Sequence, residues 1–179
     1  FNKKYSKSRY LKRIVSGTEQ GASHMADGYA RATGKAGIVV CDSDTGATNT
    51  ITGLQTANMD SAPLVVFVCH FTEDKNLTNL FEHIDHIGIS RSCTKHNFLV
   101  KNIEDLARVV REAIHLSVTG RPGTILVDIS QEVLEDTANF KFPKLEKISG
   151  YKVPVLAPKK DIKRASKLIM NSKRPIVFG

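Results

Sequence analysis

A single glutamate stands where a helix is predicted to begin. Thr18 is a suitable N-cap, and a run with helical spacing extends from Glu19 to Ala32 before Gly34 ends it. The ordinary role of an acid in a first helical turn is to interact with the helix dipole. At the end of a sheet, the same carboxyl group is also placed to share a proton with a bound ligand. Glu19 is therefore the first candidate for acid–base chemistry.

Two histidines have the one-turn spacing of a metal site. His83 and His86 stand beside Glu82 and Asp85, and all four side chains are types that bind metal ions. No third, distant ligand is evident in the sequence. We therefore expect no metal ion to bind within this chain.

The three cysteines indicate a reducing compartment. Cys41, Cys69 and Cys93 are odd in number, are widely spaced and form no CxxC pair, so neither a disulfide framework nor a zinc site is expected. No secretory signal is visible, and the longest apolar run, residues 63–68, is too short to span a bilayer. We expect no membrane partner and a cytoplasmic location, with an organelle as the alternative.

The formal net charge of +8 does not by itself predict nucleic-acid binding. The basic residues are concentrated in two terminal stretches, Lys3 to Arg13 and Lys159 to Arg174. Neither stretch has the pattern of basic and aromatic residues that marks an RNA-binding motif. A lysine-rich solvated surface is the simpler interpretation, and we expect no nucleic-acid partner.

Alternating strands and helices must position these side chains. Short apolar runs at residues 36–41, 63–68 and 124–129 predict buried strands, and residues 13–16 predict a short strand end. Helices are predicted at residues 19–32, 47–59 and 103–118. This order indicates an α/β fold, with a parallel sheet covered by helices on both faces.

In such a sheet, ligands bind at the carboxyl ends of the strands. Residues 42–46, 70–79 and 130–132, together with the turn before Glu19, are predicted to lie at this edge.

A second α/β domain is predicted to begin near the end of the chain. We assign residues 1–139 to the first domain, 140–158 to a proline-containing linker and 159–179 to the start of the second domain. That start would consist of a helix at 161–170 and a strand at 175–179. Because the chain begins with Phe1 and ends within a strand-like run, we expect it to be a piece of a longer protein.

Three stretches together resemble the amino-terminal, pyrimidine-binding domain of thiamine-diphosphate enzymes. They are the run from Glu19 to Gly34 with its Tyr-Ala-Arg-Ala-Thr-Gly ending, Gly46-Ala-Thr-Asn49, and Gly120-Arg-Pro-Gly123 followed by the strand ending at Asp128. Met59-Asp-Ser-Ala-Pro-Leu64 and Gly88-Ile-Ser-Arg91 narrow the resemblance to the acetolactate synthase, or acetohydroxyacid synthase, type.

The resemblance implies a role for Glu19. In this family a glutamate hydrogen-bonds the pyrimidine ring of thiamine diphosphate and favours the imino tautomer, which removes the thiazolium proton. The reaction implied is decarboxylation of pyruvate and condensation with a second 2-oxo acid, in the biosynthesis of valine, leucine and isoleucine. Glu19 would be both catalytic and cofactor-binding.

Further residues and partners follow from the same resemblance. Arg121 would contact FAD, and Phe81, His70 and Gln131 would line the substrate pocket. Mg²⁺ would be bound with the diphosphate by a carboxyl-terminal domain through a Gly-Asp-Gly motif, which this chain lacks. A homodimer or tetramer and a small regulatory subunit are implied, so residues 1–179 alone should be inactive.

The chain departs from the family pattern at the predicted working edge. The departures are Thr18 for histidine, Asp44 in the turn before Gly46, His70 and Glu82 for glutamines, and Gln131 for lysine. These changes leave three alternatives to acetolactate synthase open: a pyruvate oxidase, a 2-oxo acid decarboxylase, or a non-catalytic remnant with an assembly role.

Overall fold

The computed structural model describes residues 12–41, 44–69, 84–141, 144, 148–154 and 156–178. The chain divides into two compact units, Phe1–Ile148 and Ser149–Gly179. This division does not fix the ends of a linker, so the domain limits 1–139 and 159–179, with a linker at 140–158, stay predictions.

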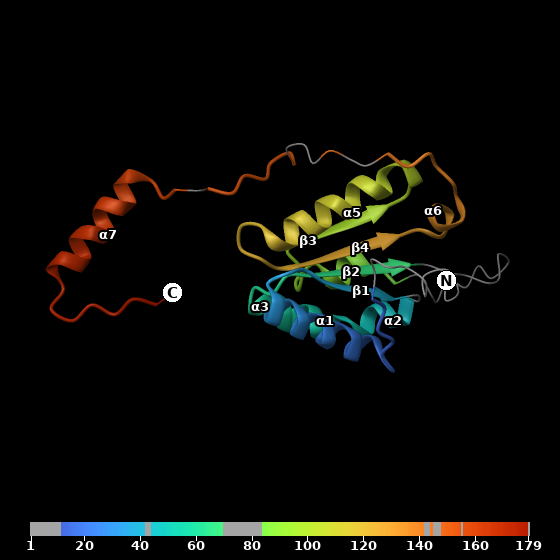
Figure 1. Ribbon diagram of the computed structural model, residues 1–179, viewed down its shortest axis with the longest axis horizontal. Coiled ribbons are helices and arrows are strands. Elements are labelled where there is room, and N and C mark those ends of the chain that lie inside the picture. Colours follow the sequence, from blue (N-terminus) through green and yellow to red (C-terminus); the bar gives the residue numbers. More distant parts are fainter. Residues whose placement is uncertain are drawn as a thin grey trace. The chain divides into compact units, whose positions relative to one another are not determined.

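A four-stranded parallel sheet forms the centre of the first unit. Its strand order is β1-β2-β4-β3, and the strands are β1 (Gly37–Cys41), β2 (Leu64–Cys69), β3 (His96–Val100) and β4 (Thr124–Ile129). Figure 1 shows α1 (Glu19–Thr33) and α3 (Ile51–Met59) on one face, and α5 (Ile103–Val118) on the other. The predicted α/β fold with helices on both faces is confirmed.

The two central strands are buried along their whole length. All six residues of β2 and all six of β4 are buried, as expected for parallel strands covered on both sides. Val66 pairs with Leu126 on the face that carries α1 and α3, where Ala26 and Leu54 complete the core. The sheet is thus rigidly supported beneath the helices that carry the candidate site residues.

The two long helices begin and end where their sequence signals predict. The Thr18 side chain accepts a hydrogen bond from the Gly21 amide at 3.0 Å, and Gly34 ends α1 in the left-handed conformation at φ 68°. α5 starts after Asn102, although the Asn102 side chain makes no capping hydrogen bond.

The buried face of α1 differs from the predicted one. The sequence suggested Ala22, Met25, Ala26 and Tyr29 as the apolar face, but Met25 and Tyr29 are nearly half exposed. The buried side chains are Ser23, Ala26, Asp27 and Ala30. Small side chains are buried on this face because α3 packs closely against α1. The buried Ser23 hydroxyl donates a hydrogen bond to the Gln20 carbonyl at 2.7 Å.

The helix predicted at residues 47–59 is two helices, α2 (Asp44–Asn49) and α3. They meet at Thr50, which is fully buried and donates its hydroxyl hydrogen to the Ala47 carbonyl at 2.7 Å. The Thr50 backbone amide also bonds the Ala47 carbonyl, at 3.1 Å, three residues back instead of the four of an α-helix, so the regular pattern is interrupted there.

Two strands predicted from short apolar runs are absent. Residues 13–16 are described without strand structure, and Ile14 and Val15 are 68% and 74% exposed. Residues 175–178 are likewise described without strand structure. Neither run pairs with a neighbouring strand among the described residues, and an apolar run without a partner does not form a sheet.

Among its described residues the second unit has one helix, α7 (Lys159–Asn171), which confirms the helix predicted at 161–170. Its apolar side chains are exposed, among them Leu168 and Met170. Among the described residues no helix is both long and apolar enough to cross a membrane.

Candidate functional site

Glu19 lies at the carboxyl edge of the sheet. α1 ends shortly before β1 begins at Gly37, so its carboxyl end lies at the amino edge and its first residue at the opposite edge (Figure 1). α2 follows β1, and α6 (Gln131–Glu135) follows β4, which brings their first turns to the same edge. The Glu19 side chain is partly buried there.

The Glu19 carboxylate contacts the second motif directly. The Asn49 side-chain amide, at the end of α2, donates a hydrogen bond from Nδ2 to Glu19 Oε2 at 3.2 Å. A carboxylate oxygen only accepts hydrogen bonds, so the nitrogen of the Asn49 amide is the atom that faces it. Glu19 and the Gly46-Ala-Thr-Asn49 stretch, which lie far apart in the sequence, therefore form one site.

The Thr18 departure has a local structural explanation. Its hydroxyl oxygen caps α1, so this position stabilises the first turn that carries Glu19. The hydroxyl groups of Ser16 and Thr18 lie close to Gly21, three residues after the cap: a Cβ there would be 2.8 Å from Ser16 Oγ and 3.1 Å from Thr18 Oγ1.

Gln131 lies at the same edge, and its side chain forms a hydrogen bond to another residue of α6. Its side-chain amide Nε2 donates to Glu135 Oε1 at 2.8 Å, one turn along α6. A substrate-pocket role for Gln131 stays a prediction.

Arg121 lies at the opposite, amino edge of the sheet. It stands in the loop between α5 and β4, where Nε donates to Ser61 Oγ at 2.8 Å and Nη2 to the Met59 carbonyl at 3.3 Å. These contacts tie the loop to the turn after α3. The length of the sheet therefore separates Arg121 from Glu19.

The remaining predicted positions lie outside the described residues. They are His70, Phe81, Glu82 and His83, and for Asp44 only the backbone is described. Their roles stay predictions. Within the described part of the chain, no group of three metal-binding side chains occurs.

A buried histidine–aspartate pair was not predicted as a site. His86 Nδ1 of α4 (His86–Ser90) lies 3.2 Å from Asp128 Oδ2 of β4, and the two side chains are only 2% and 9% exposed. The sequence held one signal, since an aspartate inside a buried strand requires a polar partner. Nothing in the sequence identified His86 as that partner.

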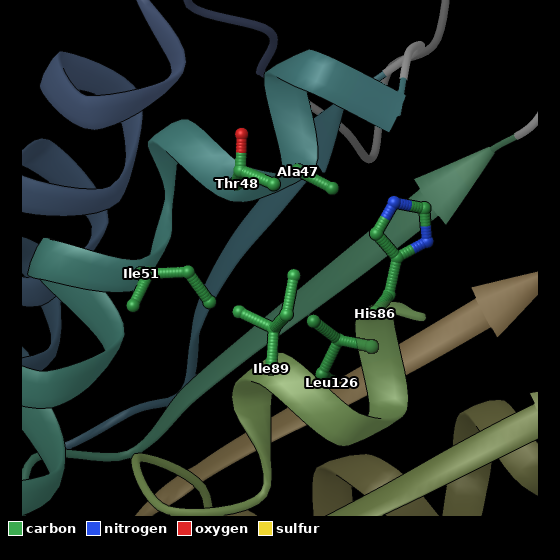
Figure 2. Close-up of a pocket in the computed structure, with 6 residues that line it drawn as sticks. All are labelled: Ala47, Thr48, Ile51, His86, Ile89 and Leu126. Atoms are coloured by element: carbon green, nitrogen blue, oxygen red, sulfur yellow. The ribbon is translucent and has the colours of Figure 1, made fainter. Parts of the chain in front are cut away.

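A shallow hollow lies between His86 and α2. Figure 2 shows His86 and Leu126 facing Ala47 and Thr48 across it. The side chains around it leave essentially no room for a water molecule, so it is a packed contact and not a ligand cavity. His86 thus lies beside the helix that ends at Asn49.

Comparison with known proteins finds a family that matches the amino-terminal part of the chain. Residues 1–89 match the family described as thiamine pyrophosphate enzyme, N-terminal TPP binding domain. Thiamine pyrophosphate and thiamine diphosphate are two names for the same cofactor.

Similarity to individual proteins extends over nearly the whole chain. The chain is 41% identical to the acetolactate synthase large subunit of Buchnera aphidicola subsp. Schizaphis graminum, over 94% of this chain and 30% of that protein. It is 39% identical to an acetolactate synthase of Mycobacterium leprae, over 96% of this chain and 27% of that protein. With the acetolactate synthase isozyme 3 large subunit of Escherichia coli, identity is 41% over 89% of this chain and 28% of that protein. The chain therefore spans less than a third of the length of these relatives.

Proposed function

Because the chain belongs to the thiamine pyrophosphate enzymes, we propose that the protein is an acetolactate synthase whose activating glutamate is Glu19. The proposed reaction is decarboxylation of pyruvate and condensation with a second pyruvate or 2-oxobutyrate, which serves branched-chain amino acid biosynthesis. The observation that carries the proposal is the hydrogen bond from Asn49 to the Glu19 carboxylate at the carboxyl edge, where Glu19 as a residue is partly buried.

The residues at this edge suit the pyrimidine half of thiamine diphosphate. A carboxylate fits a ring nitrogen that gains a proton, and Glu19 projects from a first helical turn into the region where α/β sheets bind ligands. When bound, the cofactor supplies the nucleophilic carbon that attacks the 2-oxo acid. Glu19 would hold the proton shared with the ring nitrogen, while Asn49 fixes one of its two oxygens.

The other cofactors and partners belong to the same proposal. Mg²⁺ and the diphosphate would be held by a domain that carries the Gly-Asp-Gly motif, which residues 1–179 lack. FAD would contact Arg121, whose guanidinium has further donors besides the two used on Ser61 and Met59. The working protein would be a homodimer or tetramer with a small regulatory subunit, in a reducing cytosolic or organellar compartment.

Two glutamates in equivalent places allow a decisive test. Glu104 lies exposed in the first turn of α5, which also starts at the carboxyl edge of the sheet. In the whole protein supplied with pyruvate, thiamine diphosphate and Mg²⁺, Glu19→Gln should lower acetolactate formation at least about a hundredfold, a typical loss for an acid–base group. Glu104→Gln should leave it unchanged. If the two substitutions have equally small effects, Glu19 is only a helix-dipole acid and the proposal fails.

Product analysis distinguishes the related activities. Acetolactate from pyruvate supports the proposal, whereas acetaldehyde would indicate a 2-oxo acid decarboxylase and acetyl phosphate a pyruvate oxidase. Absence of any product from the whole protein would favour a non-catalytic role in assembly.

A further inference from the structure

The Glu19–Asn49 hydrogen bond is one contact between α1 and the segment of α2 and α3, and a second is between Ser23 and Gly53. Four residues after Glu19, Ser23 is fully buried; four residues after Asn49, Gly53 is buried as well. A Cβ built on Gly53 would collide with Oγ and Cβ of Ser23, so the two helices touch there at backbone distance. Residues four apart share a helix face, so on α1 this close contact lies one turn along from Glu19.

The backbone of Asn49 is fixed by its buried neighbours in the sequence. The following residue, Thr50, is fully buried, and its hydroxyl donates to the Ala47 carbonyl at 2.7 Å. Ala47 is only 1% exposed and belongs to the hydrophobic core. The backbone on both sides of Asn49 is therefore anchored in the core, while its exposed side chain extends to Glu19.

From this geometry we propose that Asn49 is the positioning residue of Glu19. Its amide holds Oε2 of the carboxylate and so directs the other oxygen, Oε1, to the pyrimidine nitrogen. The inference rests on the proposed function, because it concerns the same site.

The contact is a hydrogen bond from an amide N–H to a carboxylate oxygen, and such a bond to a charged acceptor is stronger than one between neutral groups. Asn49 touches neither cofactor nor substrate in this account, and it acts only through Glu19.

The first test concerns the contact itself and needs no cofactor. In isotope-labelled protein of residues 1–179, the Asn49 side-chain amide protons should shift on Glu19→Gln, because a charged acceptor is replaced by a neutral one. Asn171, at the exposed end of α7, gives an internal reference whose resonances should not move. An Asn49 amide that does not respond to Glu19→Gln overturns the proposal.

The second test separates hydrogen bonding from shape. Aspartate has nearly the size of asparagine but donates no hydrogen bond and adds a negative charge beside Glu19. In the whole protein, Asn49→Ala should slow exchange of the cofactor's thiazolium C2 proton with deuterated solvent about tenfold, which is the scale of one hydrogen bond to a charged group. Asn49→Asp should slow it further, and Asn171→Ala should leave it unchanged.

Affinity for thiamine diphosphate, measured separately by titration, should change less than the exchange rate in both Asn49 variants. A merely structural role predicts the reverse order, with Asn49→Asp milder than Asn49→Ala, and that result would remove the proposal.

The two proposals fail in different ways. Normal exchange and turnover in Glu19→Gln contradict the proposed function, whereas a strong effect of Glu19→Gln without one from Asn49→Ala contradicts only the role of Asn49.

Discussion

His86 Nδ1 lies 3.2 Å from Asp128 Oδ2 in the interior of the first unit, where the pair joins the first residue of α4 to the carboxyl half of β4. The α4 backbone is secured next to it, because Ser90 Oγ donates to the His86 carbonyl and the Cys93 amide to the Ser90 carbonyl. A short helix of five residues has little stability of its own. The buried pair is therefore a principal anchor of α4 on the sheet.

Replacing Asp128 should destabilise the fold. Asp128→Ala removes a buried partner of His86, and we expect the free energy of unfolding to fall by about 2–3 kcal/mol. Urea denaturation followed by circular dichroism measures this change. Asp136→Ala, at an exposed aspartate after α6, is the control and should change it by less than about 0.5 kcal/mol. Equal values for the two variants would show that the pair does not anchor α4.

The close approach of α1 and α3 makes Gly53 sensitive to one added methyl group. Gly53→Ala should lower the free energy of unfolding by about 1–3 kcal/mol, because its Cβ would overlap Ser23. In a Ser23→Gly background the overlapping atoms are absent, so the same substitution should cost markedly less. Denaturant unfolding of the two single variants and the double variant gives this difference.

Gly28 provides the matched control for that experiment. It lies in the interior of α1, and a Cβ there would meet no atom within 4 Å. Gly28→Ala should therefore stabilise the protein, by roughly 0.5–1 kcal/mol from helix propensity alone. A destabilising Gly28→Ala would mean that glycine substitutions in these helices do not report on the Ser23–Gly53 contact.

Stability should fall in alkaline solution, in part through Cys93. Burial raises the pKa of the Cys93 thiol above its ordinary value of 9.0, and the side chain is only 2% exposed. The unfolded thiol ionises at lower pH than the folded one, so this contribution is fully present below the unfolded pKa and is lost as pH rises toward the folded pKa. Unfolding measured at about pH 7 and about pH 10 should show a smaller alkaline loss in Cys93→Ala than in the unsubstituted protein.

Arg121 should affect flavin binding without affecting the Glu19 site. Its two hydrogen bonds to Ser61 and the Met59 carbonyl are exposed, so Arg121→Ala should change the free energy of unfolding by less than about 1 kcal/mol. In the whole protein, FAD affinity measured by flavin fluorescence should fall about tenfold or more, which is the loss of one or two charge-assisted contacts. Arg164→Ala, in exposed α7, should leave it unchanged. An unaltered FAD affinity in Arg121→Ala would contradict the flavin role.

The sequence predicted best those elements whose signals are local. Thr18 and Gly34 bracket α1 through a side-chain cap and a left-handed residue, and the continuous apolar runs of β2 and β4 need no tertiary information to be recognised. β3 escaped prediction because it is an edge strand in which His96 and Leu99 are exposed, so its apolar pattern is broken. The division at Thr50 is a change in the backbone hydrogen-bond pattern at a buried residue, which no periodicity reveals.

The candidate site was predictable as a set of motifs but not as a geometry. The sequence identified Glu19 and the Gly46-Ala-Thr-Asn49 stretch separately, and only the fold brings Asn49 to the Glu19 carboxylate. The same limit explains the misjudged face of α1. Its buried side is chosen by the backbone contact at Gly53 rather than by the hydrophobicity of Met25 and Tyr29.

The position of Arg121 at one end of the strands and Glu19 at the other has a consequence for how such proteins diverge. β4 has six residues, and at about 3.3 Å per residue they span roughly 20 Å between the two ends. Groups so far apart, without shared partners, contribute to binding and stability independently. A lineage can therefore abandon or replace the ligand at one end while selection preserves the chemistry at the other. Because the sheet keeps the two groups apart, substitutions near Arg121 and substitutions near Glu19 can accumulate independently of each other.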